Sequence, residues 1–158
     1  MREHPDHYDA ELLLRLYDLR RESKLRQARD WFLQEFAASS NEELEKRFRD
    51  YPEESRFFRM VLSYWDMAAS IVNHGLINEA FFFENTGEFW VVWTKVEHLA
   101  SRVREARKYP LAWKNLETLA DKFEKWMATQ APEALDALRA RVLKSGKESA
   151  SSSTAKNP

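Results

Sequence analysis

The segment from Pro52 to Asn73 is the feature that most narrows the choice of fold. Pro52 suits the first turn of a helix, where a missing N–H group has no partner to lose, and Glu53 and Glu54 suit the positive end of the helix dipole. At 100° per residue, the apolar side chains of this helix cover an arc of roughly 220°, against roughly 100° on an ordinary surface helix. We therefore predict a central helix that other helices contact on at least two sides.

The composition also favours helices. Three Gly and five Pro in 158 residues are too few for the turns of a many-stranded β fold, and 44% hydrophobic with 32% charged residues is typical of one globular domain. The absence of Cys excludes disulfides, thiolate zinc sites and cysteine nucleophiles. No window approaches the roughly 20 apolar residues of a membrane span. With a formal net charge of −1, we expect a cytoplasmic protein without overall attraction to nucleic acid.

A long first helix is predicted over residues 8–37. Asp6 or Asp9 would cap its start, and apolar residues follow at helical spacing. The apolar stripe lapses around Ser23 and then resumes. The first half of this helix therefore either projects beyond the body of the domain or bends near Ser23.

Further helix signals follow along the chain. Ser40 and Glu43 form a capping-box pattern for a short second helix, and Gly75 suits the left-handed C-cap of the 52–73 helix. Asn78 would cap the next helix. Helices are predicted over residues 78–83, 88–108, 110–129 and 132–144.

Together these signals predict an all-α fold. We expect a compact antiparallel bundle of five to seven helices that forms a single domain over residues 1–144. Residues 145–158 are Ser-rich and lack large apolar side chains, so we expect a disordered C-terminal tail there.

The aromatic stretch "NHGLINEAFFFENTGEFWVVW", residues 73–93, could form a core, a partner surface or a membrane anchor. Three consecutive Phe, residues 81–83, cannot all point the same way on a short helix, which favours burial in a corner of the core. Trp65 lies near the middle of the widest apolar arc. Trp90 lies at the edge of the arc of its own helix, so we expect it to tolerate truncation better than Trp65.

The segment "LSYWDMAASIVNHGLINEAFFFENTGEFWVVW" and the following "REARKYPLAWKNLETLA" resemble a bacterial family known as domain of unknown function 4760. The resemblance covers about residues 24–127. The matching positions are Trp65–Asp66, Gly75–Leu76, Phe81–Phe83, Trp93, Arg107, Pro110 and Glu117. The resemblance implies a helical fold and transfers no activity.

Patterns that carry chemistry are weak in this chain. No His has a Glu three residues before it, as a di-metal helical bundle requires, and His4 and His7 lie in a polar lead-in. The three Gly are scattered singly, so no phosphate-binding loop is present, and no Ser lies in a glycine elbow. We expect a non-enzymatic protein with no catalytic residues, metal or cofactor.

The candidate binding residues lie along the polar seam of the 52–73 helix, at the end of the 88–108 helix and on the helix that follows it. The seam includes Arg59, Asp66 and Asn73. Arg107 falls on the apolar line of its helix, where a charge is expensive unless it is paired. We predict that Glu117 pairs with Arg107, with Asp66 as the second choice; alternatively the guanidinium reaches water while the stem covers the core.

The leading functional hypothesis is a non-catalytic protein-interaction or scaffold module. Its contact face would be Leu12, Leu16 and Leu19, on the first half of the first helix, binding a protein partner or a second copy. The competing hypothesis is a small-molecule or peptide sensor with a pocket beside the polar seam. A weaker alternative is a nucleic-acid-associated protein using the basic segments "RLYDLRRESKLRQAR" and "SRVREARK", which more simply form solvated helix faces.

Overall fold

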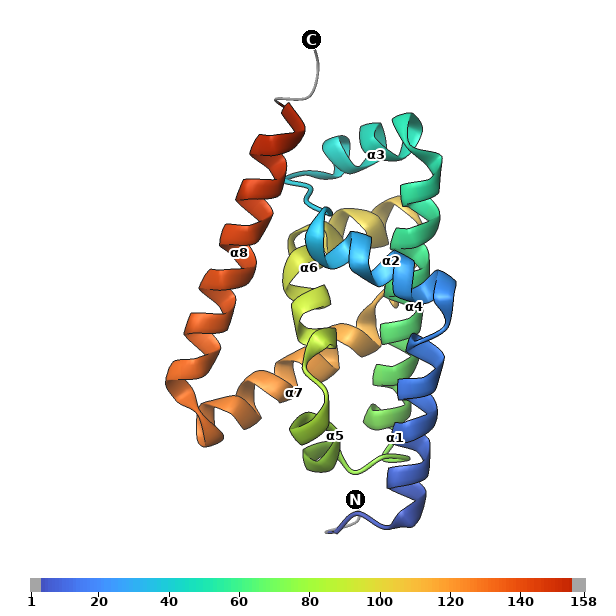
Figure 1. The fold of residues 1–158 in the computed structure, drawn as a ribbon, viewed down its shortest axis with the longest axis vertical. Helices are drawn as coiled ribbons and strands as arrows, with labels where there is room; N and C mark the ends of the chain where they lie inside the picture. Colours follow the sequence, from blue (N-terminus) through green and yellow to red (C-terminus); the bar gives the residue numbers. More distant parts are fainter. Residues whose placement is uncertain (1–3, 155–158) are drawn as a thin grey trace.

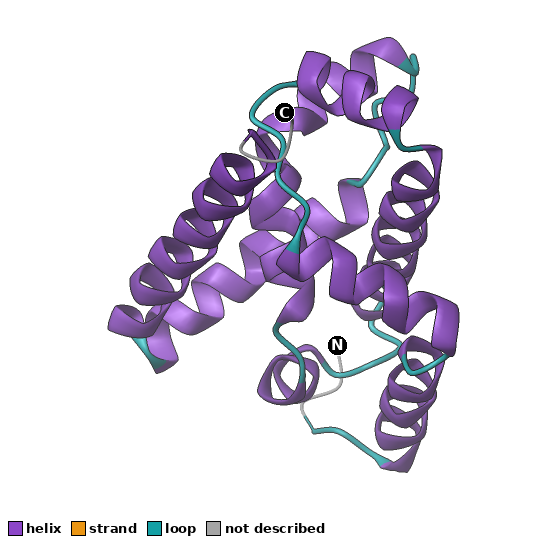
Figure 2. Ribbon diagram, turned by 45° about the horizontal axis from the view of Figure 1, so that its top comes forward, coloured by secondary structure: helices purple, strands orange, loops and turns teal. Residues whose placement is uncertain are grey.

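The computed structural model describes residues 4–154, and over these residues it contains eight α-helices and no strand (Figures 1 and 2). The all-α prediction is confirmed, but the predicted number of five to seven helices is wrong. The helices are α1 (His7–Arg20), α2 (Ser23–Gln34), α3 (Asn41–Asp50), α4 (Pro52–Asn73), α5 (Glu79–Asn85), α6 (Glu88–Ala106), α7 (Lys114–Gln130) and α8 (Pro132–Thr154).

The α4 helix is central, as its wide apolar arc predicts. Nine of its 22 residues are buried, and α2, α3, α5, α6 and α7 all pack against it. Figure 1 shows α4 running along one side of the molecule, with α2 lying across α4 and α6. Its ends also match the sequence signals: Pro52 occupies the first turn, and Gly75 adopts a φ of 73° after the last turn.

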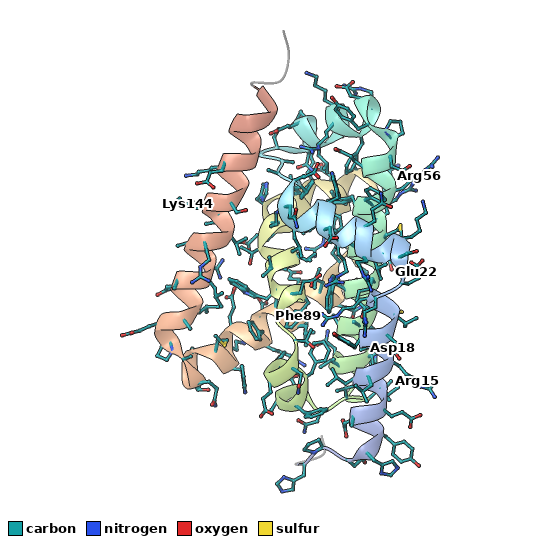
Figure 3. All side chains as sticks on the ribbon, in the orientation of Figure 1. Arg15, Asp18, Glu22, Arg56, Phe89 and Lys144 are labelled. Carbon is teal, nitrogen blue, oxygen red and sulfur yellow. The ribbon has the colours of Figure 1, made fainter. Side chains whose placement is uncertain are left out.

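The three consecutive Phe of α5 belong mainly to the core. Phe82 and Phe83 are 1% and 5% exposed, while Phe81 is partly buried. Phe83 stacks on Phe89 with ring centroids 6.0 Å apart, and Phe89 meets the edge of Phe123 at 5.3 Å. Figure 3 shows Phe89 in the interior of the bundle. This aromatic cluster joins α5, α6 and α7.

Trp90 departs from the expectation that it lies at the edge of a buried face. Its side chain is 1% exposed, like that of Trp65, and its Nε1 donates to Glu124 Oε1 at 2.9 Å. The arc on α6 alone did not show this, because α7 and α8 both pack on α6 and cover a wider part of it.

The predicted single helix over residues 8–37 is two helices. Its bend lies where the apolar stripe lapses near Ser23, and Glu22 is the N-cap of α2. The Glu22 carboxylate accepts hydrogen bonds from the N–H groups of Lys24 and Leu25 at 3.1 and 3.0 Å. These bonds also lower the pKa of Glu22. A long N-terminal helix is therefore replaced by α1, a sharp turn and α2.

The α1 helix does not project from the domain. Near its start, Asp9 is buried and accepts a hydrogen bond from the backbone N–H of Asn78, just before α5. Near its end, the Tyr64 hydroxyl of α4 donates to the carbonyl of Leu16. Arg20 Nη1 also lies 3.9 Å from the carboxylate of Glu88 at the start of α6. These contacts hold α1 along the body of the domain.

The predicted oligomer face on α1 is therefore not a free stripe. Leu16 is 7% exposed and lies in the core of its own chain, and Leu12 packs partly against that core. Leu19 is 54% exposed. The stripe was expected to lack an internal partner, but the break at Glu22 folds α1 back against α4. Self-association of the protein stays a prediction, but the stripe of Leu12, Leu16 and Leu19 no longer supports it.

The start of α7 and the end of α8 are later than the sequence indicates, while α8 begins at Pro132 as predicted. α7 begins at Lys114 rather than near residue 110, because Trp113 adopts a left-handed backbone with φ 58° and stops the helix from starting earlier. α8 continues to Thr154, ten residues beyond the predicted end at Lys144. Residues 145–154 of the expected disordered tail are thus helical, and residues 155–158 lie outside the described chain.

The burial of α1 gives a stability prediction. Leu16→Glu places a carboxylate in the core and should lower the free energy of unfolding by about 3 kcal/mol or more, measured by urea denaturation. The matched change Leu19→Glu, on the exposed face one turn later, should alter it by about 0.5 kcal/mol or less. A folded, fully stable Leu16→Glu protein would contradict the packing of α1.

The burial of Trp65 and Trp90 gives a second stability prediction. Trp65→Ala and Trp90→Ala should each lower the free energy of unfolding by about 3–5 kcal/mol, because each leaves a large cavity. Tyr8→Ala, at a side chain that is 59% exposed, serves as the control and should change it by about 0.5 kcal/mol or less. If Trp90→Ala lowers the free energy of unfolding much less than Trp65→Ala does, Trp90 is not buried as the structure shows.

Candidate functional site

A groove of about 690 Å³ lies between α4 and residues 107–115, which connect α6 to α7. Its floor contains the buried side chains of Phe58, Leu62 and Trp113. Arg59 and Arg107 line it from opposite walls, α4 and the connecting segment. The volume lies within the range of about 300–1,000 Å³ that is typical of ligand pockets.

The polar seam of α4 supplies one wall and fixes the other. Asp66 Oδ1 accepts the N–H of Leu116 at 3.0 Å, and Asn73 Nδ2 donates to the carbonyl of Asn115 at 2.9 Å. Both contacts are made to the first turn of α7; Asp66 supplies an acceptor to one of the N–H groups that lack an intrahelical partner there. Asp66 therefore both lines the groove together with Arg59 and positions α7, whereas Asn73 positions α7 without being part of the groove lining.

The connecting segment is pinned by Arg104, not by Arg107. Arg104 Nη2 donates to Glu117 Oε2 at 2.9 Å, and Arg104 Nε donates to the carbonyl of Ala112 at 2.9 Å. Lys114 Nζ also lies 2.8 Å from Glu117 Oε2. Burial alone would raise the pKa of Glu117, but the hydrogen bonds from Lys114 and Arg104 outweigh burial and lower it.

The predicted pair between Arg107 and Glu117 is therefore wrong, although Glu117 does bind an arginine of the same segment. α6 ends at Ala106, and Arg107 is its C-cap residue and is exposed. Arg104, one turn earlier, faces Glu117 instead. Arg104 and Arg107 are three residues apart, so both lie on nearly the same side of α6. The sequence could show that an arginine from this side reaches Glu117, but the choice between the two depends on where α6 ends.

Arg59 and Arg107 are the rim cations that lack an acidic partner. Within residues 4–154, neither guanidinium has a carboxylate oxygen within 4.0 Å. Arg59 Nε makes a long contact of 3.4 Å with the carbonyl of Ser55, and the guanidinium of Arg107 lies 6.0 Å from the ring centroid of Trp113. The other two rim cations are paired: Arg56 with Glu53 on the outer side of α4 (Figure 3), and Lys114 with Glu117.

Trp113 holds the floor of the groove in a strained backbone conformation. Its φ of 58° and ψ of 20° are left-handed, which is rare for a bulky residue and costs about 1–2 kcal/mol. The ring is 7% exposed and meets Phe58 edge-on with centroids 5.7 Å apart. Burial of the ring against Phe58 offsets the strain. Strain of this kind is common at binding sites.

Two further observations bear on the class of site. No group of three or more potential metal-ligating side chains occurs in the described part of the chain. Among residues 4–154, no helix combines the length and the apolar character that crossing a bilayer requires.

These features define the class of protein as an all-α domain with a ligand-sized groove beside its central helix. A family model described as a domain of unknown function (DUF4760) matches residues 7–126, well over half of the chain, and the chain belongs to this family. The match begins at α1, earlier than the resemblance from residue 24 indicated, and ends within α7, so α8 lies beyond it. No curated protein and no solved structure matches the chain.

The pairing of Glu117 can be measured by double-mutant cycles. Arg104→Met and Glu117→Gln should show a coupling free energy of about 1 kcal/mol, because the two side chains are mostly buried and hydrogen-bonded. Arg107→Met with Glu117→Gln is the matched control and should be additive within about 0.5 kcal/mol. Coupling to Arg107 in place of Arg104 would restore the pair that the sequence predicts.

Proposed function

We propose that this chain is a non-catalytic binding module whose groove takes an acidic, partly apolar peptide segment of a partner protein. The observation that carries the proposal is the pair of rim arginines, Arg59 and Arg107, which lack acidic partners within the described residues and flank an apolar floor. A guanidinium can bind a carboxylate through two parallel hydrogen bonds. The floor would take an apolar side chain of the same peptide.

The surroundings of the groove support a peptide. Tyr109 and Leu111 line it and are 53% and 58% exposed, so apolar contact area continues beyond the floor. Aromatic residues and arginines are the side chains that most often dominate binding energy at protein interfaces.

A small anionic molecule with an apolar part would use the same groove, because the sensor hypothesis placed its pocket beside the same seam. We favour the peptide because the exposed rim residues are accessible to a longer chain. A cytoplasmic location remains part of this proposal.

The nucleic-acid alternative receives less support from the charge distribution. Many cations of the basic segments are paired within the chain: Arg15 with Glu11, and both Arg20 and Arg29 with Glu88. Arg29 binds Glu88 through two nitrogens, with Nε and Nη2 at 2.7 and 2.6 Å from its oxygens. Paired cations release fewer counterions from a nucleic acid and contribute less to binding it.

The test uses fluorescein-labelled peptides of about ten residues that alternate Asp or Glu with Leu or Phe. A matched set carries Asn and Gln in place of the acids. Fluorescence anisotropy should show that the acidic set binds at least tenfold more tightly and that Arg107→Met weakens this binding about tenfold, the effect of losing about 1.4 kcal/mol. The stability of Arg107→Met should be unchanged, because Arg107 is exposed and forms no ion pair with any carboxylate of residues 4–154.

Arg15→Met is the control for net charge, since Arg15 lies on α1 away from the groove and its side chain is 72% exposed. This variant should bind the acidic peptides like the unmodified chain. Equal binding of acidic and neutral peptides, or equal loss in Arg15→Met and Arg107→Met, would refute the proposal. Tighter binding of a labelled single-stranded RNA than of any peptide would favour the nucleic-acid alternative instead.

A further inference from the structure

A second cavity, of about 260 Å³, lies between α1, α4 and the end of α5. Figure 1 shows α1 running beside α4, with α5 at the same end of the molecule. Much of the cavity wall is apolar, with Leu13 and Leu14 coming from α1 and Phe82 from α5. Its volume is just below the range of about 300–1,000 Å³ that is typical of drug-sized ligands, so it suits a small molecule. The groove beside residues 107–115 shares none of its lining residues.

Arg20, the last residue of α1, brings the one charged side chain to this wall within residues 4–154. Its side chain is 17% exposed, and its guanidinium makes no hydrogen bond to the described residues. Each of its nitrogens nevertheless keeps accessible surface, unlike Nε1 of Trp65, which is fully enclosed. A guanidinium carries five N–H donors. Arg20 can therefore bind an acceptor that enters the cavity.

The positive charge of Arg20 is only partly balanced. Within the described residues, the one carboxylate within 4.0 Å of this guanidinium belongs to Glu88, and Arg29 occupies both of its oxygens, at 2.7 and 2.6 Å. Arg20 Nη1 lies 3.9 Å from Glu88 Oε2, which is too long for a hydrogen bond. Tyr64 lines the same cavity and stays neutral, because burial raises its pKa to about 12 and its hydroxyl donates to the carbonyl of Leu16. Two guanidinium groups thus share one carboxylate, which leaves one positive charge without a counterion.

Two aromatic rings hold this guanidinium at the cavity wall. Arg20 Cζ lies 5.0 Å from the ring centroid of Tyr17 and 5.7 Å from that of Trp65, and both residues line the cavity. Such rings attract a cation, but they do not replace the hydrogen bonds that N–H donors lose on burial. The rings therefore position the cation and leave its donors available to a ligand.

We propose that this cavity binds a small monocarboxylate with an apolar body. The carboxylate accepts two parallel hydrogen bonds from Arg20 and supplies the missing counterion. The apolar body packs against Leu13, Leu14 and Phe82. One unmatched positive charge favours a monoanion over a dianion such as phosphate. The proposal is independent of the peptide groove, since the two sites have no lining residue in common.

The test uses the full chain with benzoate and hexanoate as probes, titrated while ¹H–¹⁵N correlation spectra are recorded. The shifts should saturate and should involve residues 13–20 and 82–86. Benzamide and hexanamide have the same shapes without the charge. They should bind about tenfold more weakly, because they leave Arg20 without a counterion.

Two further probes test the apolar wall. Acetate lacks the apolar body, and inorganic phosphate lacks it and carries a second charge. Each should bind about tenfold more weakly than hexanoate, because the contacts with the leucines and Phe82 are lost. Phosphate that binds as tightly as hexanoate would refute a monocarboxylate site.

Arg20→Met removes the cation and should weaken benzoate binding about tenfold or more, since a hydrogen-bonded charge pair is lost. Arg21→Met is the matched control for net charge. Arg21 is the next residue in the chain, is exposed and does not line the cavity. This variant should bind benzoate like the unmodified chain, and an equal loss in both variants would contradict the role of Arg20.

Tyr17→Glu tests the same charge while Arg20 stays in place. A glutamate three residues before an arginine on a helix is placed to pair with it, so this variant supplies a counterion from within the chain. Tyr17→Gln is the matched control, with the same length and no charge. Tyr17 is 45% exposed, so both variants should fold. Tyr17→Glu should bind benzoate about tenfold more weakly than Tyr17→Gln, and this comparison decides alone if Arg20→Met fails to fold.

Four outcomes would overturn the proposal. They are shifts that do not saturate, equal affinity for benzoate and benzamide, equal benzoate binding by the two Tyr17 variants, and shifts at residues 107–115 in place of residues 13–20 and 82–86. The last outcome would assign the carboxylate to the groove of Arg59 and Arg107 instead.

Discussion

The nine buried side chains of α4 require cover over most of the circumference of that helix, and this requirement organises the domain. Each buried aromatic side chain contributes about 2–3 kcal/mol when it leaves water, so α2, α3, α5, α6 and α7 gain stability by packing on α4. Glu88 then joins the N-terminal helices to this body, since it binds both Arg20 and Arg29. The helices are thus placed by what α4 must bury rather than by their own caps.

The polar seam of α4 follows from the same constraint and gives the domain its groove. Asp66 and Asn73 are directed at the first turn of α7, so the seam is used to place that helix. Arg59, further up the seam, remains on the groove wall and faces the connecting segment that carries Arg107. A surface that can bind an acidic partner therefore arises beside contacts that are structural.

Several features of the site could be predicted from sequence, and others could not. The seam residues and Glu117 were identified because polar residues at the edge of an apolar arc must face either water or a neighbouring helix. The partner of Glu117 was misassigned because Arg104 and Arg107 differ by less than one turn, and the choice depends on where α6 ends.

The sequence by itself determined the helical class, the central position of α4 and most helix starts, because apolar periodicity and capping residues act over one or two turns. Ser40, Pro52, Gly75 and Asn78 all occupy the positions that these rules assign. Only the tertiary structure decided that α1 folds back on α4 and that Trp113 delays the start of α7. These outcomes depend on contacts between residues far apart in the chain, such as Tyr64 with Leu16 and Arg104 with Glu117. These contacts form only when the helices pack, so their free energies cannot be inferred from a local sequence pattern.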